Sequence, residues 1–469
     1  MVDVELVDEP DEHERVVRPP ADEDLPEPDD GVPERPAGLR RRQRLIAALV
    51  AVGLLLGLFT ARDRSLERQR DEALVAAAAA VPGVVGSLRD PLAAWPARGP
   101  VVSAAGVVLV LESVGGRTRT IAHDRRTGAA LWTAGTSTTP AGSPLRCPAA
   151  IGGGVLLCDV DGRDGVGSPI TDEVLGGLPD QLIAVDGATG EVTGLRVLPA
   201  GTVGWAATDK DVVVARRVAD AIVVERSGAL SHEAVWSRSI PLPAGVLARH
   251  LRLIVADGLV VLDGPLAAVL GLADGAVRGT WGTAPPSVVR VTTGPLGFTV
   301  RTPDATTWYD RSGAAGAAGG ALLGEPVTPA VDDGSLGQVV LVKDGGSLLG
   351  VDVVGGSVRW SRATVVAVHL RLDGLLLVQD ERALRAVTIG SGQQVWSVPA
   401  PDPDLTVLSD GVRALVATEG TPGRPGTMTA YRLTDGATLW SAPLPPETSG
   451  LLALDGLAVA TGERDVVLG

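Results

Sequence analysis

The chain has 469 residues and a formal net charge of −15, with 60 glycines, 34 prolines and two cysteines. This length accommodates two ordinary domains or one large all-β domain with a substantial core. The sequence contains no asparagine, which excludes N-linked glycosylation and every ligand contact that needs an Asn side chain. No basic patch with interleaved aromatic residues is present, so the pattern does not indicate binding to nucleic acid.

Most of the negative charge lies in residues 1–34, which contain fourteen Asp or Glu against two Arg, a local balance of −12. The remaining residues are close to neutral, at −3. A proline-rich acidic segment cannot bury enough apolar surface to order itself. We therefore expect residues 1–39 to form a disordered acidic tail in the cytoplasm, either a solvated spacer or a docking site for a basic partner.

An uncharged apolar segment of seventeen residues, Leu45 to Ala61, lies between Arg44 and Arg62. This length is at the short end of the range of about 17 to 25 residues for a membrane-spanning helix, and flanking arginines can extend it by snorkelling. A cleaved signal peptide is an alternative, but the acidic leader is not a short basic region and no clear cleavage site follows. A buried soluble helix is a further alternative. We predict a single transmembrane helix over residues 40–62.

The orientation of this helix depends on the arginines and the cysteines. Arginines are nearly balanced on the two sides, so they favour a cytoplasmic N-terminus only narrowly. A two-residue turn at Gly152–Gly153 would place Cys147 opposite Cys158. The two would form a hydrogen-bonded pair, in which side chains are farther apart than in a non-hydrogen-bonded pair. A longer loop or a bulge would change this register. We expect a disulfide, with two buried thiols as the alternative. A disulfide fits an oxidising compartment, so we expect a single-pass plasma-membrane protein with its large domain outside the cytoplasm.

Residues 63–86 are rich in Ala, Leu, Glu and Arg and end at Pro82–Gly83, which predicts a helical stalk. From residue 87 to residue 469, short Val, Leu, Ile and Ala runs alternate with Asp-Gly, Thr-Gly and Gly-Gly pairs. This pattern is typical of many short strands joined by tight turns.

The strands form a repeat whose last strand ends in Gly, three residues and Trp. Four copies are intact, with the pairs Gly128 and Trp132, Gly356 and Trp360, Gly392 and Trp396, and Gly436 and Trp440. Weaker copies have Gly190 followed by Gly194 in place of Trp, Gly228 with a longer turn before Trp236, Gly275 with a late Trp281, and Gly313 without a terminal Trp. The eight turn glycines are on average 44 residues apart, the length of a four-stranded propeller blade.

This repeat predicts an all-β β-propeller. A Trp on the outermost strand can pack at each blade junction, and the Gly permits a positive φ in the turn before it. The C-terminal strands lack the Gly-to-Trp ending, whereas "PLAAWPAR" offers a lone strand with Trp95, so we expect the two ends to share a blade. Eight units plus this blade would make nine, which is more than usual. We therefore expect eight blades, with one weak unit not forming its own, and with seven or nine as alternatives.

The ending Ala-x-Asp-x-x-Thr-Gly-x-x-x-Trp resembles the repeat of the pyrroloquinoline quinone (PQQ) family of β-propellers, over most of residues 90–469. This family includes quinoprotein alcohol dehydrogenases and also noncatalytic scaffolds, such as the outer-membrane assembly lipoprotein of the β-barrel machinery, so the fold alone does not decide catalysis. The resemblance to the dehydrogenases implies a disulfide of adjacent cysteines and calcium held by Glu and Asn. Here the cysteines are eleven positions apart and Asn is absent.

Other candidate sites are weak. The acidic segment at 159–165 could suggest a calcium loop, but Arg163 stands where an oxygen ligand is needed. The histidines His123, His232, His250 and His369 lie in different repeats without the spacing of metal ligands. We therefore expect no catalytic residue, cofactor or metal.

These observations predict a noncatalytic, membrane-anchored scaffold of the bacterial cell envelope. Its inter-blade loops at 161–180 and 420–426 would bind another envelope protein of unknown identity. A ligand-sensing propeller and a PQQ-dependent oxidoreductase are the alternatives.

Overall fold

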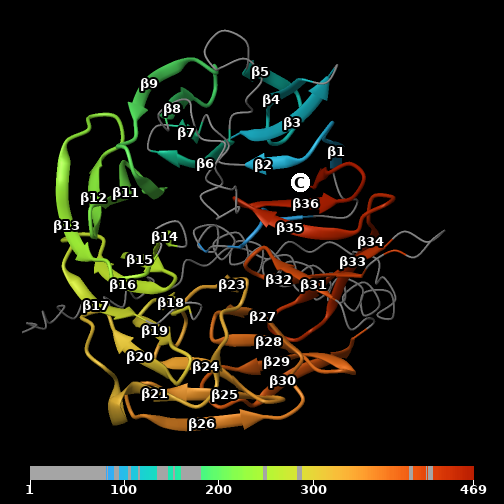
Figure 1. Ribbon diagram of the computed structural model, residues 1–469. Helices are drawn as coiled ribbons and strands as arrows, with labels where there is room; N and C mark the ends of the chain where they lie inside the picture. Colours follow the sequence, from blue (N-terminus) through green and yellow to red (C-terminus); the bar gives the residue numbers. More distant parts are fainter. Residues whose placement is uncertain are drawn as a thin grey trace, which may run out of the picture. The chain divides into compact units, whose positions relative to one another are not determined.

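Figure 1 shows the computed structural model of the chain, whose second compact unit, Gln69–Gly469, contains everything described below. The structure describes residues 81, 83–88, 94–103, 107–114, 117–134, 146–151, 154–159, 181–246, 251–282, 288–400, 405–418, 420 and 426–468. The predicted tail, the predicted membrane helix at Leu45–Ala61 and most of the predicted stalk lie outside these residues. In the part of the chain that is described, no helix has the length and apolar character needed to span a bilayer.

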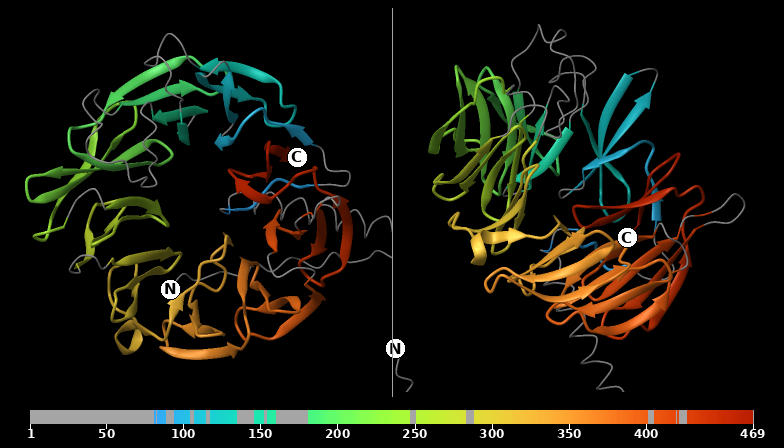
Figure 2. Two further views of the ribbon diagram at one scale, coloured as in Figure 1. Left: turned by 45° about the vertical axis from the view of Figure 1, so that its right-hand side comes forward. Right: turned by 60° about the horizontal axis from the view of Figure 1, so that its bottom comes forward.

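The described strands form nine sheets. The left view of Figure 2 shows that they follow one another around a ring. Blade one contains β2 (Val101–Ser103), β3 (Val108–Val114), β4 (Arg117–His123) and β5 (Ala130–Ala134), and blade two contains β6 (Arg146–Ile151), β7 (Val155–Asp159), β8 (Gln181–Asp186) and β9 (Val192–Val197). Blade three contains β10 (Thr202–Ala207), β11 (Asp211–Val218), β12 (Ala221–Gly228) and β13 (Ala234–Pro241), and blade four contains β14 (Arg252–Ala256), β15 (Leu259–Asp263), β16 (Leu266–Gly271) and β17 (Val277–Gly282).

Blades five to eight continue the ring. Blade five contains β18 (Arg290–Gly294), β19 (Gly297–Arg301), β20 (Thr306–Asp310) and β21 (Ala321–Leu322), and blade six contains β22 (Glu325–Pro326), β24 (Val339–Asp344), β25 (Ser347–Asp352) and β26 (Ser357–Arg362). Blade seven contains β27 (Ala367–Leu372), β28 (Leu375–Gln379), β29 (Ala383–Thr388) and β30 (Gln394–Pro399), and β23 (Val331–Asp332) is added to this sheet. Blade eight contains β31 (Thr406–Ser409), β32 (Arg413–Thr418), β33 (Thr427–Arg432) and β34 (Thr438–Pro443).

Blade nine joins strands from distant parts of the sequence. It contains β35 (Gly450–Leu454), β36 (Leu457–Thr461), β37 (Val466–Leu468) and, as its outermost strand, β1 (Ala94–Pro96). Strands β1 and β37 are antiparallel, with Trp95 opposite Val467, and Figure 1 shows β1 beside the red strands. The predicted shared blade is therefore confirmed.

The ring has nine blades, so the prediction of eight was wrong. Each weak unit, including the two without a terminal Trp, forms its own four-stranded sheet. The physical reason is that strand pairing is set by the apolar strands and their tight turns, which every unit keeps. The terminal Trp is a junction residue, and its loss does not remove a blade.

The apolar core lies between neighbouring blades. The second strands are the most deeply buried, as in β11, where Val212, Val213 and Ala215 have no exposed surface. These strands are covered on both faces, which explains their continuous runs of Val and Leu. In the outermost strands, exposed and less exposed residues alternate instead, and the residue before each junction Trp is exposed to solvent.

Blades five and six depart from this regular plan. Strand β21 is short and is preceded by a 3₁₀ helix, η2 (Ala317–Gly320). Strand β23 follows β22 in the sequence but pairs in parallel with β27, the inner strand of blade seven. Blade six thus contributes a segment to the inner edge of its neighbour.

Residues 83–88 also pack on the inner strands. Val84 forms a parallel bridge with Ser409 of β31, and the amide of Gly86 donates to the carbonyl of Gly456 in blade nine. The guanidinium of Arg413 donates to Ser87 Oγ and to the carbonyl of Leu88. This segment, which leads from the predicted stalk, is thereby attached to blades eight and nine.

Candidate functional site

The repeated Trp and Gly meet across blade junctions, and the two residues of each contact come from successive repeats. The ring of a Trp on one outermost strand lies on the turn glycine of the next blade. A Cβ added to that glycine would lie 2.5 to 2.8 Å from the ring, in the pairs Trp95 with Gly128, Trp132 with Gly190, Trp236 with Gly275, Trp360 with Gly392, and Trp396 with Gly436. All five glycines have positive φ, so each position excludes a side chain for two reasons.

The same five indoles make an equivalent hydrogen bond. Each Nε1 donates to the carbonyl three residues before the turn glycine of the next blade, at 2.6 to 3.2 Å; the acceptors are Arg125, Gly187, Leu272, Ile389 and Leu433. A buried indole N–H needs an acceptor, and this contact provides it. The repeated Trp is therefore structural at these junctions.

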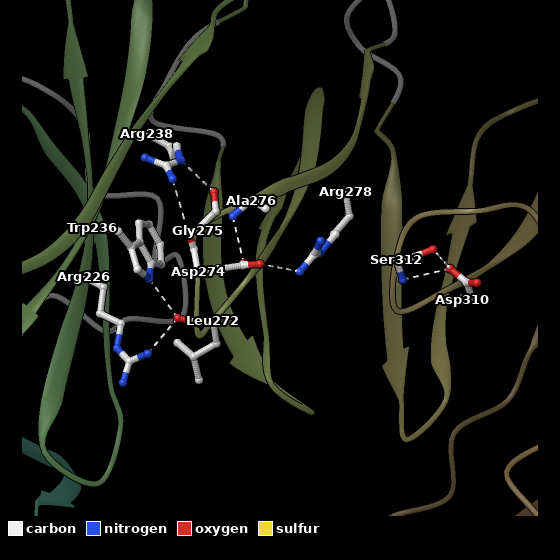
Figure 3. Close-up of polar contacts among 10 residues, drawn as sticks. All are labelled: Arg226, Trp236, Arg238, Leu272, Asp274, Gly275, Ala276, Arg278, Asp310 and Ser312. Carbon is white, nitrogen blue, oxygen red and sulfur yellow. Dashed lines mark hydrogen bonds and ion pairs between the residues drawn. The ribbon is translucent and has the colours of Figure 1, made fainter.

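Figure 3 shows the junction of blades three and four. Trp236 Nε1 and Arg226 Nη1 both donate to the carbonyl of Leu272, each at 2.8 Å. Arg226 also forms an ion pair with the buried Asp211, at 2.5 Å. From the edge strand, Arg238 donates to the carbonyls of Asp274 and Gly275. This junction combines apolar packing with a network of charged hydrogen bonds.

Where the repeat is weak, other residues occupy the junction. Blade two has Gly194 at the expected Trp position, and Arg196 replaces the indole by donating to Ser227 Oγ and the carbonyl of Gly228, at 2.6 and 2.9 Å. In the turn that follows, His232 has a φ of 59°. It stands four residues before Trp236, so it takes the conformational role expected of Gly228. This explains the longer turn in the sequence.

Two further junctions are replaced. Trp281 packs edge-on against Phe298, and its Nε1 donates to the hydroxyl of Tyr309 at 3.3 Å. At the next junction, η2 fills the space of the missing Trp, because a Cβ on Gly356 would meet Ala317. The replaced junctions thus lie after blades two, four and five.

Trp440 differs from the other junction tryptophans. Its Nε1 is buried and has no acceptor among the described residues. Its neighbour is blade nine, where the third and fourth strands come from different parts of the chain and are not joined by a turn. The carbonyl that accepts the bond elsewhere has no counterpart in that sheet.

The aspartates of the repeat shape the turns. Asp124 Oδ1 accepts hydrogen bonds from the hydroxyl and the amide of Thr127, at 2.7 and 2.8 Å, and these lower the pKa of Asp124. Asp186 has the same contacts with Thr189, which lower its pKa as well. These carboxylates satisfy backbone donors of their own turns, as expected of Asx turns.

Cys147 and Cys158 are joined by a disulfide in the structure, with Cα atoms 3.9 Å apart. The hairpin differs from the simple two-residue turn, because Ile151 pairs with Val155 across three residues. A register shift between Arg146 and Ala149 brings the cysteines opposite each other. The disulfide is buried in the core cluster of blades one and two.

The histidines do not come together. His123 stacks on Trp95, and His369 Nε2 donates to Gln379 Oε1 at 2.8 Å. Burial lowers the pKa of His369. Among the described residues, no three acidic, His or Cys side chains are grouped so that they could hold a metal ion. His250 and the segment around Arg163 lie outside the described residues.

The two predicted partner loops leave from equivalent positions. Residues 160–180 connect β7 to β8, and residues 419–426 connect β32 to β33. Both are connections between the second and third strands of a blade. In a propeller all such connections lie on one face, because the inner strands of all blades run in the same direction. The other connections of this kind in the ring have two to four residues.

A small cavity of about 60 Å³ lies where blades five, six and seven meet. Sequence reasoning did not identify it. Asp332 of β23 and Arg371 of β27 line it, together with threonines and two aromatic rings. Burial raises the pKa of Asp332, and the nearby Arg371 opposes that shift. The two residues lie 39 positions apart and belong to no recognisable motif.

The comparisons with known proteins agree with the repeat. Residues 299–464 match the family model described as outer membrane protein assembly factor BamB. Curated protein sequences give no match.

Solved structures with a similar fold include BamB from Moraxella catarrhalis, with 14% identity, 83% of this chain and 97% of that chain covered and a TM-score of 0.37. Quinohemoprotein alcohol dehydrogenase from Comamonas testosteroni has 11% identity, coverage of 84% and 81%, and a TM-score of 0.39. The eukaryotic initiation factor has 12% identity, coverage of 77% and 90%, and a TM-score of 0.46. The chain is a β-propeller by its own sheet order, and its residues 299–464 match a family model of the PQQ-like repeat.

Proposed function

We propose that this chain is a noncatalytic scaffold of the bacterial cell envelope. In this proposal, Leu45–Ala61 anchors it in the plasma membrane with the acidic tail in the cytoplasm, and the propeller binds another envelope protein outside. The placement of the two longest connections between second and third strands on one face of the ring carries the proposal. Long loops on a rigid frame are the usual location of binding residues in a scaffold.

Two further observations support it. The family model that matches residues 299–464 is described as an assembly factor of the outer membrane. The tryptophans and aspartates of the repeat already serve the junctions and turns, as their hydrogen bonds show. These residues therefore serve the frame, and the long loops are left to bind a partner.

Affinity capture of the detergent-extracted full-length protein tests this function. We expect one envelope protein to co-purify, to be lost when residues 161–180 are deleted, and to be kept by Leu230→Ser. Leu230 is the matched control because it is 49% exposed in a turn between third and fourth strands, on the opposite face. Retention of the partner by the deletion variant would contradict the assigned face. A co-purifying quinone with calcium would instead make the protein an oxidoreductase.

Protease protection tests the membrane orientation. Protease added to spheroplasts should degrade the propeller and leave an epitope on residues 1–39 intact. Degradation of the epitope with protection of the propeller would reverse the proposed orientation.

A further inference from the structure

The cavity between blades five, six and seven lies beside an irregular part of the repeat. Strand β23, which carries Asp332, leaves its own blade to pair with β27. The turn Gly294–Gly297 covers one side, and its Pro295 packs against Gly334, where an added Cβ would lie 2.6 Å away. The irregular segments thus surround a defined space.

Two opposite charges face this space without pairing closely. Arg371 Nε and Asp332 Oδ1 are 3.5 Å apart, which is long for a hydrogen bond. The backbone holds each group instead. Arg371 donates from Nε and Nη2 to the carbonyl of Ser335, at 2.8 and 2.5 Å. Asp332 Oδ1 accepts from the amide of Gly334 at 2.8 Å.

These contacts leave both groups with further capacity, because a guanidinium has five donors and a carboxylate about four acceptor sites. A ligand with a carboxylate for Arg371 and a cationic donor for Asp332 would use that capacity. The hydroxyls of Thr292, Thr293 and Thr328 line the same space and offer further hydrogen bonds.

The cavity of about 60 Å³ has room for several waters or for a small polar ligand. Trp308 and Phe298 add apolar walls to the same space.

We propose that this cavity binds a small zwitterion of the α-amino-acid type, with its carboxylate at Arg371 and its ammonium at Asp332. Glycine and alanine are the smallest α-amino acids that carry both charges. The cavity lies beside a connection between first and second strands, on the face opposite the long loops. The inference is therefore independent of the proposed partner binding.

Isothermal titration of the full-length protein tests the proposal, with glycine and L-alanine as probes and acetate and methylammonium as single-charge comparisons. We expect saturable binding of glycine or alanine only. Arg371→Gln and Asp332→Asn should each weaken it at least about tenfold, the loss of a hydrogen bond to a charged group. The control Arg359→Gln removes the more exposed ion pair with Asp352 and should bind normally.

Three results would overturn the proposal: no saturable heat with any amino acid, equal binding of acetate, or full binding by both charge variants. Should Arg371→Gln fail to fold, Thr293→Leu supplies a second test, since it fills the cavity without removing a charge. This variant should fold, as judged by its thermal unfolding midpoint, and should not bind. Normal binding by Thr293→Leu would place the ligand elsewhere and contradict the site.

Discussion

Two kinds of blade junction hold this ring together. At five junctions an indole covers the turn glycine of the next blade and donates to the carbonyl three residues before it. At three others, Arg196, the Trp281–Tyr309 pair or η2 takes that place. The replaced junctions lie after blades two, four and five. The same structural position between blades can therefore be filled by an indole, by a guanidinium, by an aromatic pair or by a short helix.

The largest expected effect is the loss of an intact junction. Trp396→Ala removes a buried ring and its hydrogen bond, and should lower the free energy of unfolding by about 3 to 5 kcal/mol. Arg196→Ala at a replaced junction removes two hydrogen bonds of a charged group and should cost about 1 to 3 kcal/mol. Urea unfolding of both variants measures the difference. Equal losses would show that the two kinds of junction contribute alike.

The next effect separates the two reasons for a turn glycine. In Gly392→Ala, the new alanine must keep a positive φ, and its Cβ would lie 2.8 Å from the Trp360 ring. In Gly345→Ala, the alanine must keep a φ of 56°, but no atom lies within 4 Å of its Cβ. The first variant should lose roughly 1 to 3 kcal/mol more than the second in urea unfolding. Equal unfolding midpoints would argue against close packing at the junction.

A smaller effect concerns the indole hydrogen bond alone. Trp396→Phe removes a bond to Leu433 of 2.6 Å and should cost about 1 kcal/mol beyond the change in ring size. Trp440→Phe removes a donor without an acceptor among the described residues, so it should lack that cost. Thermal unfolding midpoints compare the two. A larger loss for Trp440→Phe would reveal an acceptor at the ninth blade.

The smallest effect is a pH dependence in blade seven. Burial lowers the pKa of His369 in the folded chain, so the unfolded chain takes up a proton first as the pH falls. Stability is therefore full above the ordinary histidine pKa of about 6.5 and declines below it, by at most about 1.4 kcal/mol per pH unit from this group. His369→Gln should reduce this slope between pH 7.5 and 5.5, measured by urea unfolding. An unchanged slope would assign it to other groups.

Local sequence predicted much of the frame. The spacing from Gly to Trp identified the turns and junction residues at Gly392, Trp396 and Gly436, because a positive φ and a large buried ring have strong residue preferences. It did not show that Trp396 lies on Gly436, in the following repeat. It also undercounted the blades, since nine is more than usual and we expected one weak unit not to form its own blade.

The remaining features depend on the packing of distant segments. Nothing local marks Arg196 as a junction residue, because its acceptors lie 31 and 32 positions away. The position of the cysteines opposite each other required a register shift that the sequence left open.

The sequence by itself determined an all-β repeat of seven to nine blades, a blade shared by its ends and turns that demand glycine. These follow from short-range preferences, which act within a few residues. The tertiary structure alone decided how many units form blades, which groups fill each junction and that Asp332 meets Arg371. Those outcomes depend on β23 pairing with a neighbouring blade, and no pattern along the chain encodes a contact that exists only when separate sheets pack together.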